Sequence, residues 1–398
     1  MKYVVENSRK LPIIEEYDVI VVGGGVAGIA AALAAKRNGA KTLLVERSYL
    51  LGGLATAGLV TIYLPLCDGK GKQVSFGIAE ELLRLAVLYG EENMNADVWL
   101  ETDGDEEKRK DTRFQTQFNP NLFAILCEQL LLKEDVEILY GTSLCATLLD
   151  GKKINAIITE SKSGREVYTA KAFVDATGDA DLFYQSNAKT QLFEQGNVAA
   201  HWYYEYVEGK YHLRMSGFAD IPDKYKSTEK IQSDKRKRYK GVDNKELTDF
   251  VISGRREILN SFLSKGNLNS QHILSSIATT PQIRMTRRID GAYTMNDEEC
   301  HKYFEDSVGL FSDWRKAGPV YELPFRCLYG DLDNAFACGR CISVTDDLWD
   351  VTRVIPVCAV SGEAVGAASA LLKTTIKDLD VREIQKRLMQ NGVKLHNV

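Results

Sequence analysis

The stretch that decides the fold is "YDVIVVGGGVAGIAAALAAKRNGAKTLLVE", residues 17–46. Its first six residues include a β-branched run that is typical of a buried parallel strand. Three consecutive glycines end this run, and the alanine-rich residues 26–39 predict a helix that closes at Gly39. Residues 41–46 predict a second buried strand. The stretch is therefore expected to form a strand–helix–strand unit.

The glycines of this unit have the spacing of a dinucleotide-binding turn. Gly23 permits the tight turn, Gly25 lets the backbone approach a pyrophosphate, and Gly28 lets the helix pack close to the strands. The N–H groups at the helix start attract phosphate. Glu46, at the end of the second strand, suits a ribose hydroxyl. A membrane span is rejected, because the apolar run is marginally short and glycines interrupt it.

Further segments decide which dinucleotide is bound. They are "LGGLATAG" (51–58), "VDATGDADL" (174–182), "RMTRRIDGAYTM" (284–295), "YELPFRCL" (321–328), and "NAFACGRCIS" (334–343) with "RVIPVCAVSGEAVGAASAL" (353–371). With these segments the chain resembles the glutathione-reductase-type FAD-dependent oxidoreductases, specifically the broad bacterial "FAD-dependent oxidoreductase" family. The resemblance covers about residues 17–372 and implies FAD as the cofactor.

The resemblance also implies where FAD is held. The 52–58 loop runs along the pyrophosphate, the 176–179 turn lies under the adenosine, and the last helix points at the flavin. The expected cofactor contacts are Gly23, Gly25, Val26, Ala27, Gly28, Glu46, Arg47, Gly53, Thr56, Leu144, Ala176, Thr177, Gly178, Asp179, Gly339, Arg340 and Ile355. Many relatives have aspartate where this chain has Arg340. Either Arg340 meets phosphate or flavin oxygens, or Asp346 or Asp347 supplies the carboxylate. Attachment is expected to be non-covalent, because residues 52–58 contain no His, Cys or Tyr.

The expected fold class is α/β, with a Rossmann-like FAD-binding domain and an inserted mixed α+β substrate or cap domain. The FAD-binding domain is expected to comprise residues 1–67, 118–183 and 330–375. It contains a β-meander with turns at Asp150–Gly151 and Ser163–Gly164. The cap is expected over residues 68–117 and 184–329, and a helical tail over 376–398.

Candidate catalytic groups are His201, as a proton acceptor, and the arginines Arg284, Arg287 and Arg288, which suit a substrate carboxylate or phosphate. A structural histidine and an ion-pair network are the alternatives. Cys338 and Cys341 have redox-pair spacing, but strand packing explains them as well. No His, Cys or Asp cluster has metal-ligand spacing, so no metal is expected.

The expected function is oxidation or reduction of a small polar metabolite by hydride transfer at flavin N5. The alternatives are a thiazole-synthase-like protein, either non-redox or single-turnover, that binds an adenine dinucleotide, and an NAD-dependent dehydrogenase. A second glycine fingerprint is absent from the sequence, which argues against a pyridine-nucleotide–disulfide reductase. The electron acceptor and the oligomeric state stay open.

The composition of the chain indicates which classes of partner and which cell compartment to expect. The 398 residues carry a net charge of −5, which gives no reason to expect nucleic acid as a partner. The start of the chain lacks a secretion-signal pattern, and eight scattered cysteines favour the cytoplasm. Residues 223–240 are rich in lysine and arginine; a solvated surface is favoured there over a site for an acidic partner.

Overall fold

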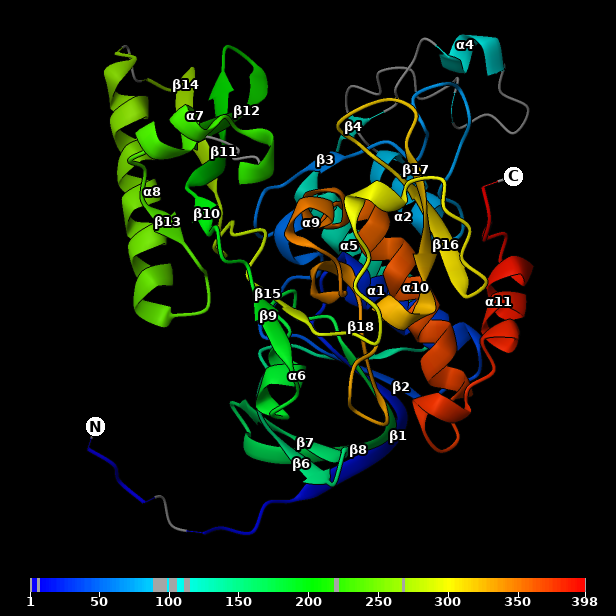
Figure 1. Cartoon of the computed structure of the whole chain (residues 1–398). Helices are drawn as coiled ribbons and strands as arrows, with labels where there is room; N and C mark the ends of the chain where they lie inside the picture. The colour runs from blue at the N-terminus through cyan, green and yellow to red at the C-terminus, as the bar shows by residue number, and fades with distance from the viewer. Residues whose placement is uncertain are drawn as a thin grey trace.

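The computed structural model describes residues 2–5, 8–88, 99, 106–110, 115–217, 222–266 and 269–397. Its centre is a seven-stranded sheet in the order β5–β2–β1–β8–β7–β6, with β18 also beside β8 (Figure 1). The parallel strands are β1 (Ile13–Val22), β2 (Thr42–Val45), β5 (Glu137–Leu139), β8 (Gly164–Asp175) and β18 (Ala335–Ala337). The antiparallel meander adds β6 (Ser143–Asp150) and β7 (Lys153–Ser161). The expected α/β class is confirmed.

Each face of the sheet is buried against a different layer. Val19 and Val21 of β1 belong to the core shared with the helices α1 (Val26–Arg37), α5 (Pro120–Lys133) and α10 (Ile355–Leu371). Ile20 and Val22 belong to the core on the opposite face, with the meander and α6 (Asp181–Gln185). The period-two alternation of a strand produces this division. Burial on both faces explains why the strand is a continuous apolar run.

Helices α1 and α10 pack through small residues. A Cβ on Gly362 would lie 2.3 Å from the Ala27 carbonyl oxygen, and one on Gly366 would lie 2.3 Å from the Ala31 oxygen. Because 362 meets 27 and 366 meets 31, the two helices run parallel and their N-termini face the same edge of the sheet. In this register the N-terminus of α10 extends six residues beyond the N-terminus of α1, which is about 9 Å at 1.5 Å per residue.

A second group of elements forms a cap. It contains the sheet β12–β11–β14, formed by β11 (Ala200–Val207), β12 (Lys210–Gly217) and β14 (His272–Ile277), and the helix α8 (Asn244–Ser264). Figure 1 shows α8 at the left edge, on the outer side of this sheet. The short strands β9 (Thr190–Leu192) and β15 (Arg287–Ile289) pair between the cap and the main sheet.

Other elements placed in the expected cap lie against the helical layer. Helix α2 (Ile78–Val87) contacts α5 and α10, and β16 (Ser307–Ser312) contacts α10. Helix α11 (Val381–Gln390) also contacts α10. The remaining helices and strands are β3 (Ile62–Tyr63), α4 (Glu106–Lys110), β4 (Thr116–Gln117), β10 (Asn197–Val198), α7 (Thr228–Ser233), β13 (Arg238–Tyr239), β17 (Val320–Pro324) and α9 (Asp346–Thr352).

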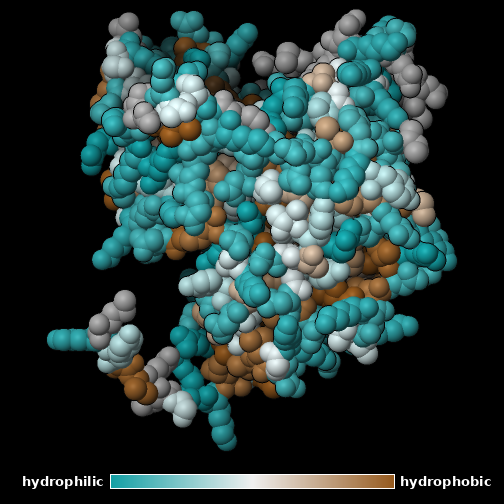
Figure 2. Space-filling model, viewed as in Figure 1, coloured by the Kyte–Doolittle hydropathy of each residue, from teal (hydrophilic) through white to brown (hydrophobic). Residues whose placement is uncertain are grey.

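The lysine- and arginine-rich segment forms ion pairs with neighbouring elements. Lys224 pairs with Asp297 at 3.0 Å and with Asp347 at 3.3 Å, and Lys237 pairs with Asp249 at 2.5 Å. Figure 2 shows that hydrophilic residues cover most of the viewed face, while hydrophobic residues gather at its lower end over the meander. Among the described helices none is by itself long and apolar enough to cross a membrane; only α9 and α10 taken together, bent by 92°, have the required length and composition.

Candidate functional site

The glycine turn after β1 leaves an open cradle at the start of α1. A Cβ on Gly23 would lie 2.4 Å from the Ala176 oxygen, and one on Gly28 would lie 1.8 Å from the Gly23 oxygen. A Cβ on Gly25 would meet no protein atom within 4 Å. Gly23 and Gly28 are therefore required by packing, whereas Gly25 borders free space. The first turn of α1, which includes Val26 and Ala27, has no side-chain cap and no acidic residue. These features fit a pyrophosphate.

The 51–58 loop lies directly against this turn. The Gly52 N–H donates to the Gly24 oxygen at 2.8 Å, and a Cβ on Gly53 would lie 3.2 Å from the Gly25 Cα. The buried Thr56 hydroxyl donates to the Leu51 carbonyl, which closes the loop on itself. Gly53 therefore borders the turn at Gly25, while Thr56 shapes the loop that carries it.

Glu46 fixes the edge of the same cradle. One carboxylate oxygen accepts from the Gly24 N–H at 2.7 Å, and the other accepts from the Ser48 N–H and hydroxyl, both at 2.7 Å. Each oxygen has two lone pairs, so capacity for a ribose hydroxyl remains. The Thr142 N–H donates to the Glu46 carbonyl at 3.0 Å, which brings the start of β6 and the partly buried Leu144 beside this edge. The neighbouring Arg47 is exposed.

The turn that follows β8 is held by a buried carboxyl. Asp175 accepts from the Thr177 hydroxyl at 2.7 Å, the Thr177 N–H at 3.1 Å and the Phe183 N–H at 3.2 Å. Burial raises the pKa of Asp175 to about 6, against the effect of these hydrogen bonds. Asp179 accepts from the Thr286 hydroxyl at 2.7 Å. Thr177, Gly178 and Asp179 therefore form a rigid turn beside the cradle.

Arg340 lies across that turn. Its Nη2 would be 2.2 Å from a Cβ on Gly178, and its Nη1 donates to the carbonyls of Ile283 at 3.1 Å and Arg284 at 3.0 Å. The Arg340 guanidinium is also 3.8 Å from Asp179.

The neighbouring third-motif groups also have protein partners. The Gly339 N–H donates to the Ser361 hydroxyl at 2.9 Å, which ties the motif to α10. Asp346 pairs with Arg288 at 3.2 Å, and Asp347 pairs with Lys224. Both aspartates considered as alternatives to Arg340 are thus bound to cations of the protein.

The N-terminus of α10, like that of α1, has no side-chain cap. Ile355 is the first residue of α10, and the preceding Val354 provides no side-chain cap. The positive end of the helix dipole is therefore free to attract negative charge. The parallel packing of the two helices places this second positive end about 9 Å ahead of the first along their common direction.

Two of the three candidate arginines are already in ion pairs. Arg287 pairs with Asp181 at 2.6 Å, donates to the Asp179 carbonyl at 2.9 Å and stacks on Tyr184 at 3.9 Å. Arg288 pairs with Asp346 and lies over the Trp349 ring at 5.4 Å. These contacts match the alternative interpretation, an ion-pair network that joins the cap to the nucleotide-binding loops.

His201 lies on the α8 side of β11. Its ring is 4.4 Å from the Phe250 ring, and a Cβ on Gly254 of α8 would lie 2.2 Å from it. Burial lowers the pKa of His201 to about 4, so the imidazole is neutral near pH 7. On the other face of the strand, the Tyr204 hydroxyl bonds Thr61 at 2.7 Å. Among the described residues His201 has no hydrogen bond to the cofactor loops, but the charge of Arg284 also lowers its pKa.

The residues that join these loops lie just before and at the start of the 284–295 segment. The Gln282 side chain donates to the Gly58 carbonyl, the Ile283 and Arg284 carbonyls accept from Arg340, and Thr286 donates to Asp179. We call residues 282–286 the strap, because this segment contacts the 51–58 loop, the 176–179 turn and the 339–341 turn. Sequence reasoning named Arg284 but missed Gln282 and Thr286.

The cysteine pair of the third motif supports the turn. Cys338 and Cys341 are buried, and neither forms a disulfide. Their sulfurs donate to the carbonyl and the side chain of Asp175, each at 3.8 Å. Among the described residues, no group of three His, Cys, Asp or Glu side chains could hold a metal ion.

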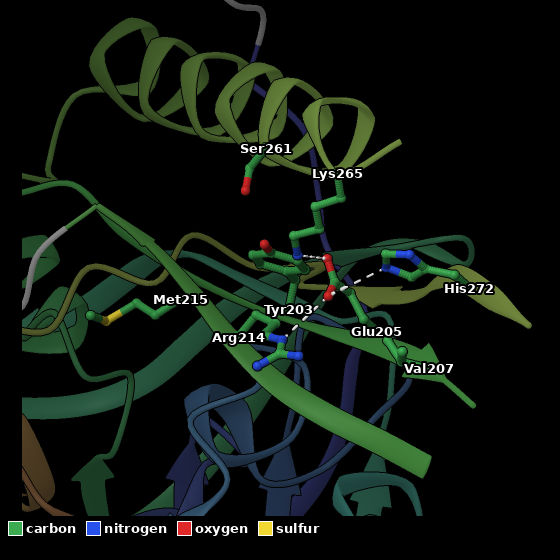
Figure 3. Close-up of a pocket in the computed structure, with 8 residues that line it drawn as sticks. All are labelled: Tyr203, Glu205, Val207, Arg214, Met215, Ser261, Lys265 and His272. Carbon is green, nitrogen blue, oxygen red and sulfur yellow. Dashed lines mark hydrogen bonds and ion pairs between the residues drawn. The ribbon is translucent and has the colours of Figure 1, made fainter. Parts of the chain in front are cut away.

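A separate pocket of about 370 Å³ lies between β11 and α8 (Figure 3). The buried Glu205 pairs there with Lys265 and with Arg214, the latter at 3.2 Å, and the His272 Nε2 is 3.7 Å away. Figure 3 shows these three basic side chains converging on the carboxylate. The pocket is on the α8 side of β11, whereas the contact of Tyr204 with Thr61 is on the opposite side.

The cradle agrees with comparisons to known proteins. A family model described as FAD dependent oxidoreductase matches residues 18–238 and 195–388. A thioredoxin reductase of Ureaplasma parvum is 36% identical over 73 residues, which is 18% of this chain and 24% of the relative. A glutathione reductase of Yarrowia lipolytica is 30% identical over 170 residues, which is 42% of this chain and 32% of the relative.

Among solved structures, a geranylgeranyl bacteriochlorophyll reductase-like protein of Thermoplasma acidophilum is 13% identical, with a TM-score of 0.49 over 95% of this chain and 84% of its own. This chain thus spans a third or less of the two reductases, and the structural likeness is distant. The family model, in contrast, covers nearly the whole chain. The chain therefore belongs to the FAD dependent oxidoreductase family, and its cofactor is FAD.

Proposed function

We propose that this enzyme oxidises or reduces a small polar metabolite, with FAD held non-covalently. When bound, FAD supplies the hydride chemistry at its N5 atom. The observation that carries the proposal is the convergence of four loops, after β1, β2, β8 and β18, on one cradle with two uncapped helix N-termini.

The residues of the cradle have separate tasks in this proposal. The start of α1 and Gly25 would hold the pyrophosphate, because backbone N–H groups and open space meet there. Glu46 would hold the ribose. The open start of α10 would stabilise negative charge on the far part of the cofactor. The strap then closes the site from the cap side.

The proposed partners are one small-molecule substrate and an electron acceptor that stays open, with neither nucleic acid nor a membrane among them. We infer a cytoplasmic location from the eight cysteines spread along the chain, none of which forms a disulfide in the structure.

The test begins with the purified protein, whose flavin absorbance is recorded before and after incubation with FAD. The loaded protein is then mixed anaerobically with a panel of metabolites, and loss of the oxidised-flavin absorbance is followed. We expect at least one small polar metabolite to bleach the flavin. A loaded protein whose flavin is reduced by no metabolite, and whose reduced flavin is reoxidised by none, would contradict the proposed reaction. Nicotinamide binding without flavin would support a dehydrogenase instead.

A further inference from the structure

Arg284 differs in its partners from Arg287, Arg288, Arg340 and Arg353. Arg287, Arg288 and Arg353 each form an ion pair, Arg353 with Asp350 at 2.6 Å. Arg340 donates to two carbonyls and lies 3.8 Å from Asp179. In the described part of the chain, the only hydrogen bond of the Arg284 side chain is from Nη1 to the Gln282 carbonyl at 3.1 Å, and no carboxylate is within ion-pair distance of it.

The surroundings of Arg284 make an unpaired charge costly. The side chain is partly buried in the strap. Burial and the like charges of Arg353 and Arg340 lower its pKa to about 9, and only Asp350 acts in the opposite direction. Asp350 is already shared by Arg353 and Arg315. A partly buried charge without a counter-ion is less favourable than a paired one, so a bound anion would stabilise this arrangement.

The position of Arg284 indicates which anion. Arg353, one of its charged neighbours, lies two residues before the uncapped start of α10, which adds a second positive end to the guanidinium. The pyrophosphate cradle is at the start of α1, about 9 Å behind α10. The other charged neighbour, Arg340, lies across the 176–179 turn, so Arg284 stands between that turn and the start of α10, which the proposed function assigns to the flavin.

The free atoms of Arg284 fit a carboxylate. Because Nη1 is used by Gln282, the Nε and Nη2 groups remain as one planar edge with two parallel donors. This edge matches the two oxygens of a carboxylate, and such bidentate pairs are among the strongest hydrogen-bonded contacts in proteins.

We propose that Arg284 binds the carboxylate of the substrate, so that the enzyme acts on small carboxylic acids. This rests on the proposed function, but its test measures binding without turnover. The same test distinguishes the two anions that could pair with Arg284, which are a free carboxylate and the phosphates of FAD.

The experiment uses the FAD-loaded protein and three variants. Formate, acetate, succinate, citrate and inorganic phosphate are titrated in turn, and perturbation of the flavin absorbance gives each Kd. Succinamide, the neutral analogue of succinate, is the ligand control. Arg284→Gln and Arg284→Lys are the test variants, and Arg382→Gln, at an exposed position on α11, is the charge-matched control.

We expect at least one carboxylate to bind saturably to the wild type and to Arg382→Gln. Its Kd should rise about 10-fold in Arg284→Lys and on the order of 100-fold in Arg284→Gln, with FAD content unchanged. Four results would overturn the proposal: no carboxylate binds the wild type, phosphate alone binds, succinamide binds as well as succinate, or Arg284→Gln keeps wild-type affinity. Loss of FAD from Arg284→Gln would also overturn it, because it would assign Arg284 to the cofactor. Failure of the proposed reaction would appear separately, as binding of a carboxylate without reduction of the flavin by any metabolite.

Discussion

Replacing Gly25 by alanine separates cofactor binding from folding. Gly25 has φ −69° and ψ 178°, an extended conformation that alanine adopts without strain, and the added Cβ meets no protein atom within 4 Å. Alanine is a poorer helix N-cap than glycine by several tenths of a kcal/mol, and it lowers the entropy of the unfolded chain by a similar amount. The two effects offset each other, so we expect the unfolding free energy of the FAD-free protein to change by less than about 1 kcal/mol.

The same methyl group occupies the space through which a pyrophosphate approaches. We expect the variant to lose two charge-assisted hydrogen bonds from backbone N–H groups to phosphate, each of about 1.5 kcal/mol or more. Together they are worth about 3 kcal/mol, which raises the Kd for FAD on the order of 100-fold. Fluorescence titration of the FAD-free protein with FAD gives this Kd, and urea unfolding gives the stability.

Gly28→Ala is the matched control. Its Cβ would lie 1.8 Å from the Gly23 carbonyl oxygen, so the helix must shift and the FAD-free protein should lose about 1–3 kcal/mol of stability. If Gly25→Ala binds FAD as tightly as the wild type, or is as unstable as Gly28→Ala without FAD, the assignment of the cradle is refuted.

Three further predictions concern buried titratable groups. Glu363 on α10 accepts from the Ile78 N–H at 2.8 Å, and burial raises its pKa to about 8. The contribution of Glu363 to the unfolding free energy therefore falls as the pH rises from about 4 to 8. Glu363→Gln should raise the unfolding free energy at pH 8 by about 2 kcal/mol or more and change it little at pH 4. Equal effects at the two pH values would contradict the raised pKa of Glu363. Burial lowers the pKa of His201 to about 4, so the unfolded state binds a proton first as the pH falls below about 6.5. Between pH 7 and pH 4, the unfolding free energy of the wild type, measured in urea, should therefore fall by up to about 3 kcal/mol more than that of His201→Gln. Parallel pH profiles of the two proteins would refute the buried neutral imidazole. Glu205→Leu should cost less than about 1 kcal/mol and leave FAD content unchanged, because Arg214 and Lys265 are 43% and 34% exposed and can turn to water; a loss above about 3 kcal/mol would show that the ion cluster holds the cap together.

Local features of the fold could be predicted because neighbouring residues determine them. The strand, turn and helix of residues 17–39 follow from a β-branched run, glycines and alanines, and the structure has them as β1 and α1. Asn119 caps α5 through bonds to the N–H groups of Asn121 and Leu122. The meander turns fall at Gly151 and Gly164, both with positive φ.

What the sequence could not determine depends on partners far along the chain. The sequence alone does not distinguish Arg284 from Arg287 and Arg288. In the structure, Arg287 is neutralised by Asp181, 106 residues away, and Arg288 by Asp346, 58 residues away. For His201, the alternation of β11 predicts that neighbouring residues face opposite sides of the strand. It does not predict which side α8 covers, and that position decides that His201 faces α8. Residues 68–117 are expected in the cap; in the described part of this segment, α2 packs on α5 and α10, where its apolar residues are buried.

The parallel contact between α1 and α10 has a consequence for how the protein is made. The two helices whose starts frame the cradle are separated by more than 300 residues, so a ribosome adding about 5–20 residues per second needs tens of seconds between them. During that time the glycine turn lacks the helix that packs against Ala27 and Ala31. FAD would thus be captured only by chains in which residues 355–371 have been made, and a chain truncated before residue 355 would be left without cofactor and open to proteolysis.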